Sequence, residues 1–129
     1  MKPLKKAEER LIERYILLTL CRQVLERDLK AFNQSSIRMK DPYVHLIEFA
    51  LTALSKELHK IKAEQRQIKM TIRRASVSDT FSEYVIYFQG YTYSMTYMNV
   101  HLKYQVQDCI EDLFGHFKHA SSVHQVSEF

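Results

Sequence analysis

Glycine and proline are scarce in this sequence, with two of each among 129 residues. All-β folds need many tight turns, which these two residues usually supply. The shortage therefore argues against such a fold and favours long helices with few joints. Hydrophobic residues make up 46% of the chain. That share is enough to build a core unaided, and the length fits one domain.

Cysteine is equally scarce, and long hydrophobic runs are missing. Small secreted domains held by disulfides normally use more than two cysteines. We therefore predict that Cys21 and Cys109 are reduced, buried thiols in a cytoplasmic protein. The apolar run at residues 15–21 is bracketed by charged side chains and is far shorter than the roughly 20 residues that span a bilayer. We expect no membrane segment and no secretion signal.

One segment, residues 41–68, has the clearest helical pattern. Apolar side chains recur there at intervals of three and four, which places them on one face of an α-helix. They are Val44, Ile47, Leu51, Leu54, Leu58 and Ile61. Asp41 followed by Pro42 is typical of a helix start. Similar stripes predict a first helix over residues 5–32 and a last helix from residue 100 to about 117, capped by Asn99.

Residues 80–98 fit two structures. Their many Tyr, Val and Ile residues favour a β-hairpin that turns at Gln89-Gly90. A 3-4-3-4 apolar spacing from Phe81 to Met98 instead fits a helix. A hairpin without a third strand is only marginally stable, and we interpret the alternating residues 68–73 as a frayed helix end or a brief extended piece. We therefore predict a fourth helix here.

Together these segments predict an all-α fold, a four-helix up-and-down bundle of long amphipathic helices. The bundle comprises residues 1–119 as a single domain, and residues 120–129, which lack periodicity, form a flexible C-terminal tail.

Several short segments resemble the YhjD-like family of small uncharacterised proteins from spore-forming Gram-positive bacteria. They are Val24-Leu25-Glu26-Arg27-Asp28-Leu29, Lys40-Asp41-Pro42-Tyr43, Lys56-Glu57-Leu58, Gly90-Tyr91 and Tyr97-Met98-Asn99. The resemblance implies an intracellular helical protein of such a bacterium or one of its phages. It implies no activity, because the family has none that can be carried over.

Positive charge is concentrated in residues 56–74, which hold seven Lys and Arg against two Glu. A basic helix face can follow nucleic-acid phosphates while nearby tyrosines stack on bases. The other interpretation is a solvated helix face or a surface for an acidic protein. The candidate nucleic-acid-binding residues are Lys56, Lys60, Lys62, Arg66, Lys69, Arg73 and Arg74.

Aromatic and methionine side chains suggest a protein interface. Tyrosine combines a large apolar area with a polar tip, and an excess of such side chains that point outward marks a contact surface. A helix that is apolar on more than one side also suits a subunit contact. The candidate interface residues are Ile16, Leu20, Tyr87, Tyr93, Tyr97 and Met98.

We predict neither a metal site nor a catalytic site. Asp112, His116 and His119 share one face of a continuous helix, but Gly115 interrupts that helix and no second helix offers a matching carboxylate–histidine pair. The serines lack a nearby His–acid pattern, and no Gly-rich phosphate loop is present. We expect no cofactor, no small-molecule ligand and no enzymatic activity.

Two functional hypotheses remain. The first is a small intracellular, non-enzymatic protein-interaction module: an adaptor, regulator or inhibitor of a protein partner, or a homodimer. The alternative is a nucleic-acid-binding accessory protein that uses residues 56–74. One exposed basic stripe free of carboxylates favours nucleic acid, and an exposed patch around Ile16, Leu20, Tyr87 or Met98 favours a protein partner.

Overall fold

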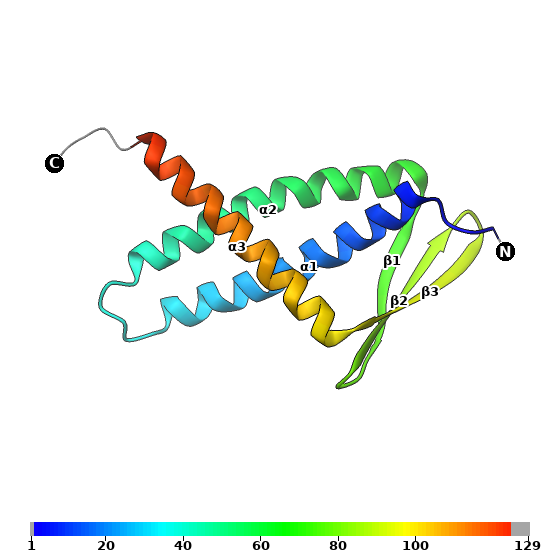
Figure 1. Cartoon of the computed structure of the whole chain (residues 1–129), viewed down its shortest axis with the longest axis horizontal. Helices are drawn as coiled ribbons and strands as arrows, with labels where there is room; N and C mark the ends of the chain where they lie inside the picture. Colours follow the sequence, from blue (N-terminus) through cyan, green and yellow to red (C-terminus); the bar gives the residue numbers. More distant parts are fainter. Residues whose placement is uncertain (1, 125–129) are drawn as a thin grey trace.

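A computed structural model describes the backbone of residues 2–124 and the side chains of residues 2–117. Three helices and a three-stranded antiparallel sheet make up the fold (Figure 1). In chain order the elements are α1 (Lys6–Asn33), α2 (Asp41–Ile68), β1 (Thr71–Val77), β2 (Phe81–Phe88), β3 (Tyr91–Met98) and α3 (Asn99–His124). Within the described part of the chain, no helix is long and apolar enough to cross a bilayer.

The helices α1 and α2 form an antiparallel hairpin whose short connection lies at the far end from the sheet (Figure 1). Both follow the predicted ranges, because their apolar stripes are buried against each other, against α3 and, for α1, also against the sheet. The side chain of Glu8 accepts a hydrogen bond from the Lys5 amide at 2.8 Å and so closes the start of α1. Lys69, at φ 56°, ends α2 in the left-handed conformation that allows the chain to turn into β1.

The prediction of a helix over residues 80–98 is wrong. Ser82, Tyr84, Ile86 and Phe88 are all buried, and this alternation is that of a strand with one covered face. Gln89 and Gly90 both have positive φ, as a tight hairpin turn between β2 and β3 requires. The hairpin pairs Phe81 with Met98 and Phe88 with Tyr91 at its two ends.

The third strand that the hairpin needs is β1, which pairs with β2 from Thr71–Tyr87 to Val77–Ser82 across one bulge. Its first residues belong to the alternating stretch that we interpreted as a frayed helix end or a brief extended piece, and the extended alternative is the one that the structure has. The all-α four-helix bundle is therefore also wrong, and the fold is α+β. A stable sheet forms because β1 gives β2 a second neighbour and α1 covers the inner face.

Two connected groups of buried side chains form the core. The helical group joins α1, α2 and α3, and consists of Leu18, Cys21, Leu25, Ile47, Ala50, Leu54, Leu58, Ile61 and Val106. The second group packs the sheet on the N-terminal half of α1 and the start of α3, and consists of Ile12, Ile16, Met70, Ile72, Tyr84, Ile86, Phe88 and Leu102. Helix α1 thus contributes to both groups.

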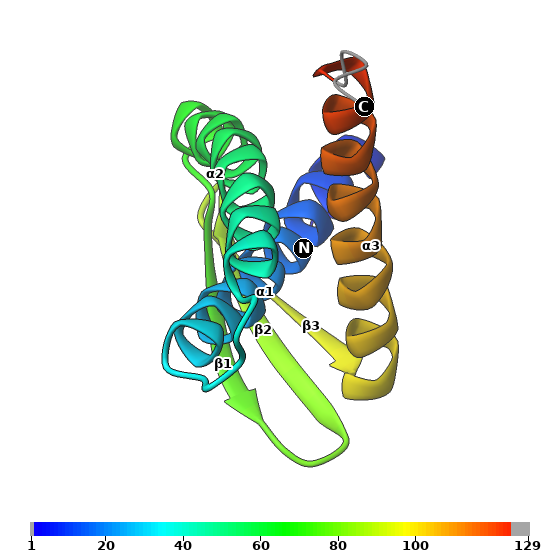
Figure 2. The ribbon, with the colours of Figure 1, turned by 90° about the vertical axis from the view of Figure 1, so that its left-hand side faces the viewer.

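Helix α3 starts directly after β3 and crosses the α1–α2 hairpin; Figure 2 shows α2 and α3 on opposite sides of α1. Asn99 holds this junction. Its Oδ1 accepts a hydrogen bond from Ser82 Oγ at 2.6 Å, its Nδ2 donates to Ser78 O and its backbone N donates to Thr80 O, both at 2.8 Å. The helix continues into the predicted tail as far as His124, and residues 125–129 lie outside the described residues.

Candidate functional site

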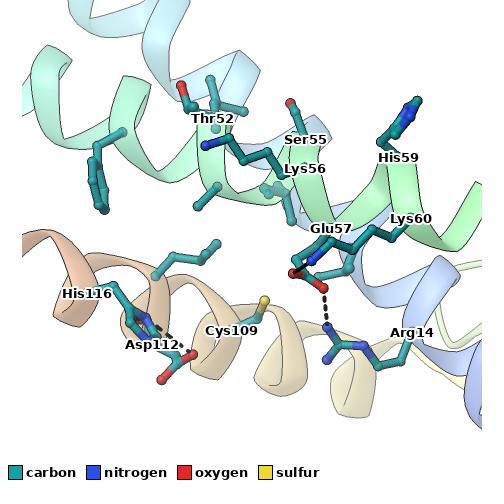
Figure 3. Close-up of a pocket in the computed structure, with 16 residues that line it drawn as sticks. Arg14, Thr52, Ser55, Lys56, Glu57, His59, Lys60, Cys109, Asp112 and His116 are labelled. Atoms are coloured by element: carbon teal, nitrogen blue, oxygen red, sulfur yellow. Dashed lines mark hydrogen bonds and ion pairs between the residues drawn. The ribbon is translucent and has the colours of Figure 1, made fainter.

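A groove of about 1150 Å³ lies between α2 and α3, with α1 at its base (Figure 3). We call it the α2–α3 groove. It exists because α2 buries its main stripe against α1 and diverges from α3, so that apolar side chains between the two helices stay open to solvent. The apolar side chains that line it are Leu18, Phe49, Leu51, Ala53, Leu54, Cys109 and Leu113.

Aromatic and charged contacts lie along the groove. Phe49 on α2 meets Phe117 on α3 edge to face, with ring centroids 5.0 Å apart. Glu57 on α2 forms ion pairs with Arg14 of α1 at 3.8 Å and with Lys60 at 3.5 Å (Figure 3). All three charged side chains remain about half exposed or more, so these pairs contribute little stability.

The rim of the groove is charged, and the two sides differ. Lys56 and Lys60 stand on the α2 side, whereas Asp112 and His116 stand on the α3 side (Figure 3). Since Lys60 is already paired with Glu57, Lys56 carries the free positive charge among the described groove residues. An apolar floor between a basic edge and an acidic edge is suited to an amphipathic segment with charges of the opposite order.

The two cysteines meet beside this groove. The pKa of the Cys109 thiol is lowered to about 7, mainly by the neighbouring Cys21 side chain, and the Arg14 guanidinium adds to the effect by stabilising the thiolate. Burial and the Asp112 carboxylate act in the opposite direction. The Cys109 side chain, together with burial, raises the pKa of Cys21. Both cysteines are free, but only Cys21 is fully buried; Cys109 is half-buried.

A smaller cavity of about 620 Å³ lies on the other side of α3, against α1. Cys109, Arg14 and Asp112 line both cavities. Cys109 therefore borders two cavities, whereas Cys21 lines neither of them.

Of the six candidate interface residues, two are exposed on the outer face of the sheet. Tyr87 and Met98 are each 44% exposed there, and Phe81, the cross-strand partner of Met98, lies beside it. Ile16 is only 2% exposed and Leu20 is half-buried against the core, so the fold has already used both.

The other two candidates, Tyr93 and Tyr97, lie on the inner face of the sheet. Tyr93 Oη donates to Lys2 O at 2.6 Å, and Tyr97 Oη contacts Met95 Sδ at 3.3 Å. Burial raises the pKa of Tyr97 to about 12, and the nearby Glu13 carboxylate adds to the effect. Their hydroxyl groups thus serve the fold rather than an open surface.

The seven candidate basic residues are exposed but do not form one stripe. Lys56 and Lys60 line the groove, whereas Lys62, two positions beyond Lys60, lies about 200° further around the helix. Arg66 follows Lys62 one turn later. Arg73 and Arg74 are consecutive residues of β1, whose side chains project to opposite faces of the sheet.

The histidine-rich end of α3 provides one weak pair. His116 Nδ1 lies 3.8 Å from Asp112 Oδ2 and 2.9 Å from Asp112 O. The side chain of His119 lies outside the described side chains. Within the described residues, no three His, Cys, Asp or Glu side chains come together as metal ligands would.

Two features of the site were missed in the sequence. Cys21 and Cys109 each lie on a recognised apolar stripe, but nothing in the sequence says that these two positions of the stripes meet. The groove was missed because an apolar stripe predicts that a helix face packs against other elements. It does not predict how much of that face those elements cover. The second apolar face of α1 was the available signal for the groove. A helix that packs on two sides keeps its neighbouring helices apart, and a groove can then remain between them.

Comparison with known proteins gives one consistent result. The sequence pattern of the YhjD protein family matches residues 3–118. The chain is also similar to "Uncharacterized protein YhjD" of Bacillus subtilis (strain 168), with 30% identity over 100 residues, which cover 78% of this chain and 83% of that protein. No solved structure gives a significant match.

Proposed function

The chain belongs to the YhjD protein family, and we propose that this member is a non-enzymatic module that holds an amphipathic helix of a protein partner in the α2–α3 groove. As an adaptor, regulator or inhibitor it would act by this contact alone. The same proposal places it in the cytoplasm, where its two free cysteines stay reduced.

The open apolar floor is the observation that carries the proposal. Leu51, Ala53 and Leu113 line the groove and are only half-buried, although they lie between packed helices. A third helix laid along α2 and α3 would cover them and complete a bundle-like arrangement. Burial of such apolar surface contributes about 25 cal/mol per Å² to the free energy of binding, and this burial would favour association of the partner helix.

Charge defines the partner further. The α2 edge carries Lys56 and Lys60, so the partner helix should have Asp or Glu along that flank of its apolar stripe. Asp112 on the opposite edge favours Lys or Arg on the other flank. Helix α3 carries Asp108, Glu111 and Asp112 and could itself supply such an acidic flank. The experiments must therefore distinguish a separate partner helix from α3 of a second copy of this chain.

Two synthetic helical peptides test the proposal. Both have the same apolar stripe at i, i+3, i+4 and i+7; one carries Glu and the other Lys on the flank that would face α2. We expect roughly tenfold tighter binding of the Glu peptide in a fluorescence anisotropy titration, since two exposed ion pairs contribute about 0.2–1 kcal/mol each. If neither peptide binds, the proposal is wrong.

Matched charge reversals locate the contact. Lys56→Glu with Lys60→Glu should invert the preference between the two peptides. Lys62→Glu with Arg66→Glu changes the same number of charges on the part of α2 outside the groove, and should leave the preference unchanged. Equal effects of both pairs of substitutions would exclude the groove as the peptide-binding site. If light scattering finds a dimer and the peptide disrupts it, the occupant of the groove is a second copy of this chain.

Nucleic-acid binding remains the second candidate because of one observation. Lys62, Arg66 and Lys69 are exposed near the end of α2, and none pairs with a carboxylate among the described residues. A fluorescent oligonucleotide should then bind with an affinity that falls steeply with salt, and Lys62→Glu with Arg66→Glu should abolish it. The absence of salt-dependent binding would exclude this function.

A further inference from the structure

Both cysteines of the chain lie where α1 crosses α3. Cys21 Sγ is 3.9 Å from Val106 O, one helical turn before Cys109 on α3. Cys109 packs against the buried group that contains Cys21, and each thiol shifts the pKa of the other. Two side chains that are far apart in the sequence thus lie close to each other, on two different helices.

Their access to solvent differs sharply. Cys21 is 0% exposed, whereas Cys109 lines the α2–α3 groove and the smaller cavity on the other side of α3. A small reagent in solution therefore meets Cys109 first. Cys21 can react only with a group that Cys109 already carries, which is the arrangement of an attacking and a resolving thiol.

We propose that Cys109 and Cys21 form a peroxide-sensitive thiol pair, in which a hydroperoxide oxidises Cys109 and Cys21 then closes a disulfide between α3 and α1. The proposal does not rest on the proposed function of the α2–α3 groove, although Cys109 lines it. Its reagent is any small hydroperoxide that fits either cavity, and its product is an intramolecular cross-link at the base of the groove.

The chemistry balances with the hydroperoxide as the sole oxidant. The Cys109 thiolate attacks the terminal peroxide oxygen, the O–O bond breaks, and the alkoxide that leaves takes a proton to become an alcohol or, from hydrogen peroxide, water. Cys109 is now a sulfenic acid. The Cys21 sulfur displaces its hydroxyl as water, using the Cys21 proton, and the S–S bond forms. Two thiols have lost two electrons, and the peroxide has gained them.

The surroundings favour the first step at Cys109. Arg14 lines both cavities and stabilises the thiolate, and the neighbouring Cys21 side chain also lowers the pKa of Cys109. Asp112 opposes them, but its carboxylate is largely exposed and therefore screened. In the second step the sulfurs must close to about 2.05 Å, which draws α3 toward α1.

Oxidation of the full-length wild-type chain with hydrogen peroxide tests the pair directly. We expect both free thiols to disappear together in a thiol titration, the intact mass to fall by two hydrogens, and peptide mapping to find residues 21 and 109 cross-linked within a monomer. Dithiothreitol should restore both thiols. Persistence of both thiols, an intermolecular disulfide, or a Cys109 sulfinic acid without any cross-link would overturn the proposal.

Two variants separate the roles. Cys21→Ala should leave a Cys109 sulfenic acid that dimedone labels, because no resolving thiol remains, whereas Cys109→Ala should leave Cys21 reduced at the same peroxide dose. Equal oxidation of Cys21 in the second variant would contradict the assigned order. Circular dichroism checks the fold of each variant, and the peptide map of the wild-type chain decides the proposal if a variant does not fold.

Discussion

The two flanks of α2 differ in how completely they are covered. Toward α1 the helix presents residues that are at most 6% exposed, namely Ile47, Ala50, Leu54, Leu58 and Ile61. Toward α3 it presents Phe49, Ala53 and Lys56, which are half-buried or exposed and line the groove. The same helix therefore makes one closed and one open contact.

The reason for the difference is where α3 is attached. It begins at the sheet, is fixed there by Asn99 and contributes Leu102 to the sheet core and Val106 to the helical core. These contacts hold the start of α3 on the sheet and on α1, and α3 meets α2 further along, where Phe117 contacts Phe49. An open flank can therefore persist in a folded protein, because the stability of the chain does not depend on closing it.

The largest expected effect comes from cutting the closed flank. Leu58→Ala removes a side chain that is 2% exposed and lies outside the groove, and should lower the free energy of unfolding by about 2–5 kcal/mol. Leu113→Ala, on the open flank, should cost only about 1 kcal/mol, because that side chain is half-buried. Urea unfolding measures both, and equal losses would mean that the two flanks are packed alike.

The two cysteines compare the flanks by reactivity. With its pKa lowered to about 7, Cys109 is roughly half thiolate at neutral pH, against about 1% for an unperturbed thiol. Its rate of alkylation by iodoacetamide should therefore rise with pH through a midpoint near 7 and fall below it as the thiolate is protonated. Cys21 should stay unmodified in the folded protein. Arg14→Gln should move the midpoint upward, and an unchanged midpoint would remove Arg14 as a cause.

The attachment of α3 can be weakened at Asn99. Asn99→Ala removes the acceptor of the fully buried Ser82 hydroxyl and one donor to Ser78 O, which should cost about 1–2 kcal/mol. Hydrogen exchange should quicken in α3 more than in α1 and α2. Asn33→Ala, at the exposed end of α1, is the matched control and should change little. Uniform quickening in all helices would contradict a separate attachment.

The smallest expected effect is a gain. Gly115 lies in α3 with nothing within 4 Å of an added Cβ, so Gly115→Ala should stabilise the protein by about 0.5–1 kcal/mol. Gly90→Ala meets the same empty space, but its φ of +78° should make that substitution destabilising by about 1 kcal/mol. Thermal unfolding compares the two, and the same sign for both would show that backbone conformation does not decide them.

The sequence predicts the helical half of this protein well and the sheet half badly. The apolar positions from Val44 to Ile61 fit only a helix, and α2 has the predicted bounds. Between Phe81 and Met98, the helical spacing and the strand alternation are both satisfied, because 11 of the 18 positions are apolar or aromatic. The presence of β1 decides in favour of the strands. Its mostly exposed, partly basic residues gave little indication of a strand in the sequence.

The site could be predicted only in part, for a related reason. Charge located the basic residues on α2, but the helix turn between Lys60 and Lys62 separates them onto two surfaces. The contact of Cys21 with Cys109 depends on the crossing of α1 and α3, and that crossing follows from a sheet that the periodicity did not reveal. Local patterns thus identify the helices but not the angle at which they meet.

The lack of any linker between Met98 and Asn99 has one more consequence. A small rotation of α3 about its junction with the sheet would produce a larger displacement at the C-terminal end of this long helix. A molecule that binds the exposed face of the β-hairpin would therefore change the width of the α2–α3 groove without contacting either helix.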